Sequence, residues 1–245
     1  VQTCALPISY GCTFKRSLNF RAKINLRGHN PSNCISIITK PNEQVYQNGK
    51  EKNFVSSLFL SNVMSLAPKI DVVSRVVENA NYDLVCITES WLRLHIPHSV
   101  IAINGYNIIR RDRKEATHGG VCMYIKVTIP FSGFRSLVGK AATNSTPKGF
   151  SSIISGVICH PPPGPDSQMQ DYLLKCLSSI ESQNPNCGIL PVGDLNHLNE
   201  ATLKSNFHLK QIIHFPTRGR SFLDPILTNI KEFYDKVIER PKLGL

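Results

Sequence analysis

The feature that most constrains the fold of this chain is a series of short apolar segments, each ending in polar residues. These segments are rich in β-branched and aromatic residues, are too short for core helices, and span 54–63, 83–88, 106–111, 121–125, 153–159 and 187–192. Such runs predict strands, and an almost fully apolar run such as 83–88 predicts a strand covered on both faces. The sequence therefore predicts several short strands rather than a helical bundle.

Two stretches have the spacing of amphipathic helices. Apolar residues recur at helical spacing from Pro68 to about Asn81, and a second apolar helical face spans 168–180. The segment 133–149 is rich in Ser, Thr, Lys and Gly and is predicted to be a loop. We expect further strands at 209–213 and 222–228, a turn at 216–219 and a short amphipathic stretch at the end. Many short strands with few helices predict an α/β sandwich of two mainly antiparallel sheets flanked by helices.

Composition places the chain among ordinary globular proteins with a basic charge. The chain has 245 residues, 41% of them hydrophobic, and a formal net charge of +11. This length predicts one domain, and the charge favours a polyanionic partner such as nucleic acid. No apolar stretch approaches the ~20 residues that a transmembrane helix needs. The eight cysteines contain no C-x-x-C pair, so we expect reduced thiols and an intracellular, nuclear or cytoplasmic location.

The first part of the chain lacks a sustained period of either strand or helix type. Residues 1–9 (VQTCALPIS) look like the translation of a sequencing adapter, and the rest of 1–52 is basic and polar. We therefore expect residues 1–52 to be an adapter-like scar followed by a poorly ordered lead-in. The folded domain is expected at residues 53–245.

Five polar residues stand at or just after the ends of predicted strands: Asn62, Glu89, Asp194, Asn196 and Asp224. Taken singly, each has an ordinary interpretation as a helix cap, a first-turn acid or a turn residue. Taken together, they would converge on one rim of an α/β sandwich. Converging carboxylates repel one another unless a cation neutralises them, and oxygen ligands suit Mg²⁺ or Mn²⁺. The sequence thus predicts a divalent-metal site.

Several motifs resemble the endonuclease/exonuclease/phosphatase (DNase I-like) superfamily over residues 54–245, and specifically its LINE-type retrotransposon branch. The blocks that carry the resemblance are N-V-M-S-L at 62–66 with Lys69, I-T-E-S-W-L at 87–92, the basic stretch 110–113 followed by G-G-V at 119–121, H-P-P at 160–162, G-D-L-N at 193–196, and F-P-T-R at 215–218 followed by L-D at 223–224 and L-T-N at 227–229. T-E-S-W-L and F-P-T-R with L-T-N are the most specific.

The resemblance implies a role for each candidate residue. Glu89 would hold the metal with the help of Asn62, Asp194 would activate water, and Asn196 would steady the scissile phosphate. Asp224 would orient a catalytic histidine. Contacts with DNA are implied for Thr217, Arg218 and Arg113.

The chain departs from the family pattern at two points. Cys159 stands where the family usually has a tyrosine before its proline pair. The sequence ends at Gly244-Leu245, where the family continues with Ser-Asp-His, so we expect a domain without its last motif and with impaired activity. Pro225 would also remove a ladder hydrogen bond from the last predicted strand.

The expected function is nicking of target DNA for retrotransposition, by a monomer joined to a reverse transcriptase domain in the parent polyprotein. An alternative is a catalytically silent nucleic-acid-binding fragment or a decayed retroelement copy. A third alternative is a phosphatase of the same superfamily. Plasmid nicking, salt-dependent DNA binding without cleavage, and release of phosphate from a small substrate would distinguish the three.

Overall fold

The computed structural model describes residues 34–39, 57–113, 118–133, 138–141, 149–162, 164–241 and 243. Its main sheet has six strands in the spatial order β12 (Tyr234–Arg240), β1 (Cys34–Thr39), β2 (Leu58–Asn62), β3 (Leu84–Thr88), β5 (Val121–Lys126) and β4 (Tyr106–Arg111). A second sheet has the order β6 (Ser132–Gly133), β7 (Val138–Ala141), β8 (Ser152–Cys159) and β9 (Cys187–Asp194). A small ribbon pairs β10 (Lys210–Gln211) with β11 (Leu227–Thr228).

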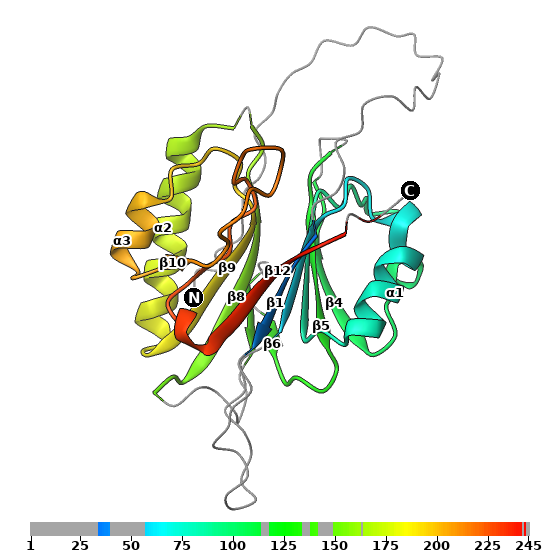
Figure 1. The fold of residues 1–245 in the computed structure, drawn as a ribbon, viewed down its shortest axis with the longest axis horizontal. Coiled ribbons are helices and arrows are strands. Elements are labelled where there is room, and N and C mark those ends of the chain that lie inside the picture. Colours follow the sequence, from blue (N-terminus) through cyan, green and yellow to red (C-terminus); the bar gives the residue numbers. More distant parts are fainter. Residues whose placement is uncertain are drawn as a thin grey trace, which may run out of the picture.

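Helices cover the outer faces of the two larger sheets (Figure 1). The α-helices are α1 (Ile70–Ala80), α2 (Asp166–Gln183) and α3 (Ala201–Asn206), and the 3-10 turns are η2 (Ala67–Lys69), η3 (His98–Ile101) and η4 (Lys231–Phe233). α1 lies outside the six-stranded sheet, whereas α2 and α3 lie outside the four-stranded one. Most strand pairs are antiparallel, and the exceptions are β2 with β3 and β8 with β9. The predicted α/β sandwich is confirmed.

Successive side chains of a strand point to opposite faces of its sheet, so each strand contributes to two apolar layers. Leu58 and Leu60 of β2 belong to the cluster between the sheets, while Phe59 between them belongs to the cluster under α1. All three are at most 1% exposed, because both faces of the strand are covered. Burying each such side chain contributes roughly 1.5–3 kcal/mol, so β2 is anchored from both sides.

The first predicted helix forms as α1 for local reasons. Val73 and Val77 are one turn apart and both are buried against the six-stranded sheet. Asn81 ends the helix in the left-handed conformation, and its backbone N–H donates to the carbonyl of Val77. The predicted end near Asn81 is therefore confirmed.

The main differences from prediction lie in strands that depend on distant partners. Residues 34–39, placed by the sequence in a poorly ordered lead-in, form β1 between β2 and β12. The predicted loop 133–149 contains β7, which pairs with β8. β12 lies within the stretch at the end of the chain that was expected to be amphipathic. The β-branched segment CISIIT of β1 is typical of a strand, and its inclusion in the lead-in missed that local signal, whereas VGKA of β7 has little strand signal. The backbone groups of both strands are satisfied by pairing across the fold.

The last predicted strands are also shorter than expected. β10 and β11 each have two residues, although strands were predicted at 209–213 and 222–228. Pro225 has no N–H to donate, and its carbonyl accepts instead from the N–H of Gly193, 3.3 Å away. The chain at Pro225 therefore joins the end of β9 rather than extending a ladder.

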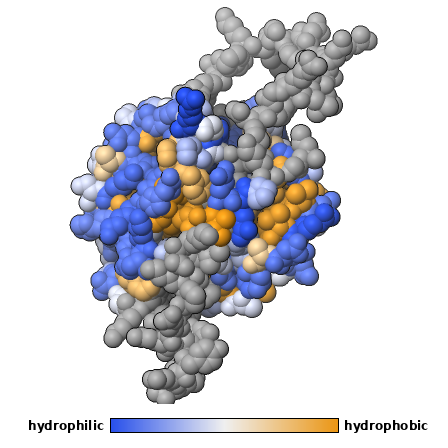
Figure 2. Space-filling model, in the orientation of Figure 1, coloured by the Kyte–Doolittle hydropathy of each residue, from blue (hydrophilic) through white to orange (hydrophobic). Residues whose placement is uncertain are grey.

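Most of the surface is hydrophilic. Figure 2 shows apolar colour gathered near the middle of the displayed face. Among the described residues, the exposed large hydrophobic side chains are Val72, Leu94, Val100, Val127 and Phe222. Over the same part of the chain, no helix is both long enough and apolar enough to cross a membrane.

Candidate active site

The two parallel strand pairs bring the predicted site residues to one rim. In the first pair, Asn62 at the end of β2 is in register with Thr88 at the end of β3, directly before Glu89. In the second pair, Cys159 at the end of β8 is in register with Asp194 at the end of β9. Parallel neighbours end at the same edge of a sheet, so each pair delivers two polar side chains together.

Two side-chain hydrogen bonds then join the sheets at this rim. Asn62 Nδ2 donates to Asp194 Oδ2 over 2.8 Å, and Cys159 Sγ donates to Glu89 Oε1 over 3.1 Å. Asn62 is 5% exposed and Asp194 is 2% exposed. The predicted convergence of Asn62, Glu89 and Asp194 is therefore observed in the geometry.

Glu89 is held by a loop that neighbouring strands support. Its Oε2 accepts hydrogen bonds from Trp91 Nε1 over 2.7 Å and from the backbone N–H of Gly119 over 2.9 Å. Trp91 in turn packs against His118, with ring centroids 4.3 Å apart and the ring planes tilted by 51°. Trp91 belongs to the I-T-E-S-W-L block, for which the resemblance implied no role of the tryptophan, and in the structure its side chain supports the Glu89 carboxylate.

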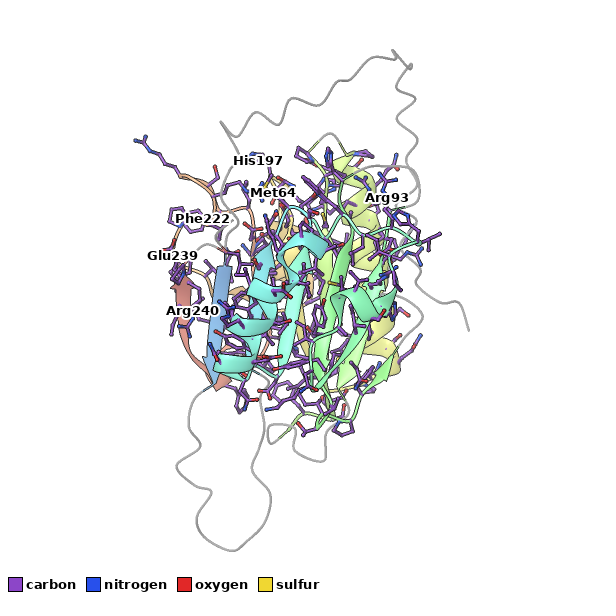
Figure 3. All side chains as sticks on the ribbon, turned by 90° about the vertical axis from the view of Figure 1, so that its right-hand side faces the viewer. Met64, Arg93, His197, Phe222, Glu239 and Arg240 are labelled. Carbon is purple, nitrogen blue, oxygen red and sulfur yellow. The ribbon has the colours of Figure 1, made fainter. Side chains whose placement is uncertain are left out.

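Uncommon backbone conformations gather at the same rim. Met64, Ser65, Glu89, Trp91 and Asn196 all have positive φ values without being glycine. The loops that contain them are joined by backbone bonds such as Ser65 N to Glu89 O, 2.9 Å. Met64 lies at the upper end of the molecule in Figure 3. Strained residues of this kind cluster at functional sites, where the surrounding structure holds them in place.

Gly193 allows Asp194 to reach the rim. Its φ is +138°, and a Cβ at this position would lie 1.9 Å from the carbonyl oxygen of Ile158 on β8. Only glycine fits such a close approach of two backbones. The G-D pair of the predicted motif therefore has a structural cause.

The Asp194–Asn196 loop is fixed from the β8 side. The backbone N–H of Asn196 donates to Asp194 Oδ1 over 3.2 Å, and Asn196 Nδ2 donates to the carbonyl of His160. His160 belongs to the H-P-P block of the predicted motifs, is 2% exposed, and has its Nε2 2.8 Å from Asp166 Oδ1. His160 is thus a buried residue that positions Asn196 through its backbone.

Arg218 lies beside the two aspartates. Its guanidinium is 2.9 Å from Asp194 Oδ2 and 3.8 Å from Asp224 Oδ1, and its side chain is 27% exposed. Thr217 is buried, and its Oγ1 accepts hydrogen bonds from the backbone N–H groups of Leu223 and Asp224. Thr217 therefore holds the Asp224 segment, and DNA contact by either residue stays a prediction.

Arg113 lies near the Glu89 side of the rim. Its half-buried side chain passes so close to Gly119 that a Cβ added there would be 2.6 Å from Arg113 Cδ. Gly119 is the residue whose N–H binds Glu89. The predicted DNA-binding residue Arg113 is therefore placed next to the predicted metal ligand, and its contact with DNA stays a prediction.

Burial and charge act in opposite directions on the titratable groups of the site. Burial raises the pKa of the Asp194 carboxyl, and the neighbouring Arg218 charge partly offsets that rise, while Glu89 adds to it. Burial also raises the pKa of the Cys159 thiol well above its ordinary value. Cys159 therefore keeps its proton and donates a hydrogen bond to Glu89.

The donor chemistry of the rim fits a hard divalent cation. Asn62 Oδ1 is buried and has no hydrogen-bond partner, which is costly unless a cation or ordered water binds it. Glu89 adds a carboxylate, and oxygen ligands of this kind suit Mg²⁺ or Mn²⁺. Within the described residues, no three His, Cys, Asp or Glu side chains group closely enough to hold a metal by themselves. A cation here would thus depend on the amide oxygen of Asn62 as well as on carboxylates.

Comparison with solved structures identifies the fold. A truncated Caenorhabditis elegans TDP2 matches with a TM-score of 0.52 and 15% identity, covering 72% of this chain and 84% of that chain. The human Nocturnin catalytic domain with bound sulfate matches with a TM-score of 0.50 and 12% identity, covering 69% and 79%. The chain thus has the predicted DNase I-like fold, which it shares with these two proteins.

A retrotransposon structure is also among the matches. The endonuclease domain of TRAS1, a telomere-specific non-LTR retrotransposon, has a TM-score of 0.49 and 11% identity, covering 69% of this chain and 82% of that chain. No protein-family model and no curated protein matches the sequence.

Proposed function

We propose that this chain is a divalent-metal-dependent DNA endonuclease domain of the LINE type, which hydrolyses one phosphodiester bond of a target strand. The observation that carries the proposal is the pair of bonds across the rim, Asn62 to Asp194 and Cys159 to Glu89. They bring together the oxygen-bearing residues to which the motif resemblance assigns catalysis. The net charge of +11 favours a nucleic-acid substrate.

Glu89 and Asn62 would hold Mg²⁺ or Mn²⁺ at the rim. When bound, the ion neutralises charge on the phosphate oxygens and on the leaving oxygen. The nitrogen and the oxygen of the Asn62 amide would have different roles. Its Nδ2 binds the Asp194 carboxylate, and its Oδ1 remains as a ligand. One side chain therefore couples the position of the cation to the position of the base.

Asp194 would accept the proton of the attacking water. A buried carboxylate is a poor base if burial keeps it protonated, and the charge of Arg218 at 2.9 Å counters that effect. Asn196 would hold the scissile phosphate, because an amide has two N–H donors and the His160 carbonyl occupies one. Asp224 contributes a second negative charge that keeps Arg218 at the rim.

The main alternative, a DNA-binding domain that does not cleave, has one observation in its favour. The Arg218 guanidinium is hydrogen-bonded to Asp194 Oδ2, the same carboxylate that must receive the proton of water. A base whose lone pairs are engaged in an ion pair is less able to accept a proton. In this reading the basic chain binds nucleic acid but does not cleave it.

Nicking of supercoiled plasmid tests the proposal. We expect slow conversion to the open circle that requires Mg²⁺ or Mn²⁺, stops with EDTA and falls at least ~100-fold in Asp194→Asn, because loss of a general base typically costs 10²–10⁴ in rate. Asn107→Ala is a matched control, since Asn107 is exposed on the edge strand β4. Salt-dependent DNA binding with no nicking above the Asp194→Asn level would replace the proposal with the non-cleaving reading.

A further inference from the structure

A polar groove adjoins the candidate active site on the side of β10. Its volume is about 620 Å³, and its walls come from the segment after β9, the start of α3, the segment after β10 and the loop before Asp224. Asn196, assigned above to the scissile phosphate, is one of its lining residues. A strand that places a phosphate at Asn196 would therefore have its neighbouring nucleotide at or in this groove.

Phe222 presents an aromatic ring to the groove. Its side chain is 49% exposed, which is uncommon for a phenylalanine in this structure, and it lines the polar groove rather than an apolar patch. In Figure 3 Phe222 and His197 both lie in the upper part of the molecule, toward the end where Met64 is labelled. An exposed ring beside polar groups suits a ligand that is flat and apolar on its faces but polar at its edges.

The backbone on both sides of Phe222 is held firmly. Before it, the N–H and carbonyl of Ser221 pair with Arg218 in a tight hairpin, at 2.9 Å and 3.0 Å. After it, the N–H of Leu223 donates to Thr217 Oγ1, and the carbonyl of Leu223 accepts from the N–H of Asn196. Phe222 is thus fixed relative to Asn196, and little order would be lost when a ligand stacks on it.

The other polar groups of the groove are compatible with a nucleotide. His197 and His214 are exposed on its walls, and both imidazoles can donate or accept hydrogen bonds at the edge of a base. The one acidic lining residue, Glu200, forms an ion pair with Lys204 at 2.6 Å. The groove therefore presents no unpaired carboxylate to a phosphate backbone.

We propose that this groove is a nucleobase subsite, in which Phe222 stacks on an unpaired base of the DNA strand next to the scissile phosphate, with His197 and His214 at the base edge. The inference rests on the proposed function for its substrate, but binding in the groove needs neither the metal nor cleavage. It assigns to Phe222 a specificity role that the motif resemblance did not include.

The test measures binding without cleavage. Fluorescence anisotropy in EDTA would follow a labelled single-stranded oligonucleotide, with 2-aminopurine placed at successive positions to report stacking. We expect Phe222→Leu to weaken binding about tenfold and to abolish the 2-aminopurine quenching at one position, because leucine keeps apolar area but has no ring. Phe222→Tyr should retain both signals.

An abasic oligonucleotide sharpens the comparison. If the base at the quenched position is removed, wild type and Phe222→Leu should bind with equal affinity, because the ring then has nothing to stack on. Val127→Ala is the matched control. Val127 is an exposed apolar residue after β5, beside the start of β3, whereas the candidate site lies beyond the end of β3.

The outcomes separate this inference from the proposed function. Equal affinities of wild type and Phe222→Leu for every oligonucleotide would overturn the subsite even if the protein nicks plasmid. A ring-dependent affinity in a protein that never nicks would keep the subsite and remove the endonuclease. Absence of any oligonucleotide binding would overturn both.

Discussion

Asn62 Nδ2 lies 2.8 Å from Asp194 Oδ2, although the two residues end strands of different sheets. This bond closes the rim of the sandwich at the point where its two parallel strand pairs end. Because both residues are buried, the bond is made in a poorly solvated place, where losing it costs more than at the surface. The candidate site is therefore also part of what joins the two halves of the domain.

Asn62→Leu should separate the two functions of the amide. The leucine has similar size, but it removes both the hydrogen bond to Asp194 and the unpartnered Oδ1 acceptor. We expect Mn²⁺ binding, measured by isothermal titration calorimetry, to weaken at least ~10-fold, because losing a group that binds or orients a metal ligand typically lowers metal affinity by that factor or more. Asn107→Leu, on an exposed edge strand, should leave Mn²⁺ binding unchanged. Equal Mn²⁺ affinity in wild type and Asn62→Leu would remove Asn62 from the ligand set.

The ion pair between Arg218 and Asp194 should be visible in a double-mutant cycle. Arg218→Ala leaves a buried carboxylate without its countercharge, so we expect the free energy of unfolding in urea to fall by about 1–3 kcal/mol. In an Asp194→Asn background the same substitution should cost less, because no buried charge remains. Additive effects of the two substitutions would mean that the pair contributes no coupling to stability.

Gly193→Ala should be more damaging than another glycine substitution at positive φ. Its Cβ would lie 1.9 Å from Ile158 O, whereas a Cβ at Gly105, where φ is +79°, meets nothing within 4 Å. Gly105→Ala should therefore lower the free energy of unfolding only by the backbone strain, about 1–3 kcal/mol. Gly193→Ala should lower it by clearly more. Thermal unfolding of both variants measures the difference. Similar melting temperatures for the two would contradict the close approach of β8 and β9.

Tyr106 should make stability fall in alkaline solution. Burial, with smaller contributions from Asp83 and Glu78, raises the pKa of Tyr106 to about 12, and its hydroxyl donates to the carbonyl of Tyr82. A tyrosine in the unfolded chain titrates near ~10, so the stabilisation is complete below that pH and is lost as pH rises toward 12. Urea unfolding at pH 9 to 12 should show this fall, and Tyr106→Phe should show a smaller one. An unchanged slope in Tyr106→Phe would assign the effect to other tyrosines.

Local pattern was sufficient for the elements that carry their own signal. The apolar run 83–88 predicted β3 at Leu84–Thr88, and the helical spacing after Pro68 predicted α1 up to its Asn81 cap. The polar residues after these runs could also be singled out as site candidates, because a catalytic or binding residue follows a buried strand in many α/β folds. In each case the signal that allowed the prediction lies within a few residues of the chain.

Only the tertiary structure decided the contacts between distant segments. β7 has little strand signal of its own and pairs with β8, while the β-branched segment of β1 finds its place between β2 and β12 only in the assembled sheet. The resemblance implied DNA contact for Arg218, which stays a prediction, and gave His160 no role. The fold adds that Arg218 pairs with two aspartates and that the carbonyl of buried His160 accepts from Asn196. Periodicity reports which face of a segment is buried, but which groups meet across that face depends on sheet order and register, and these are set by the whole chain.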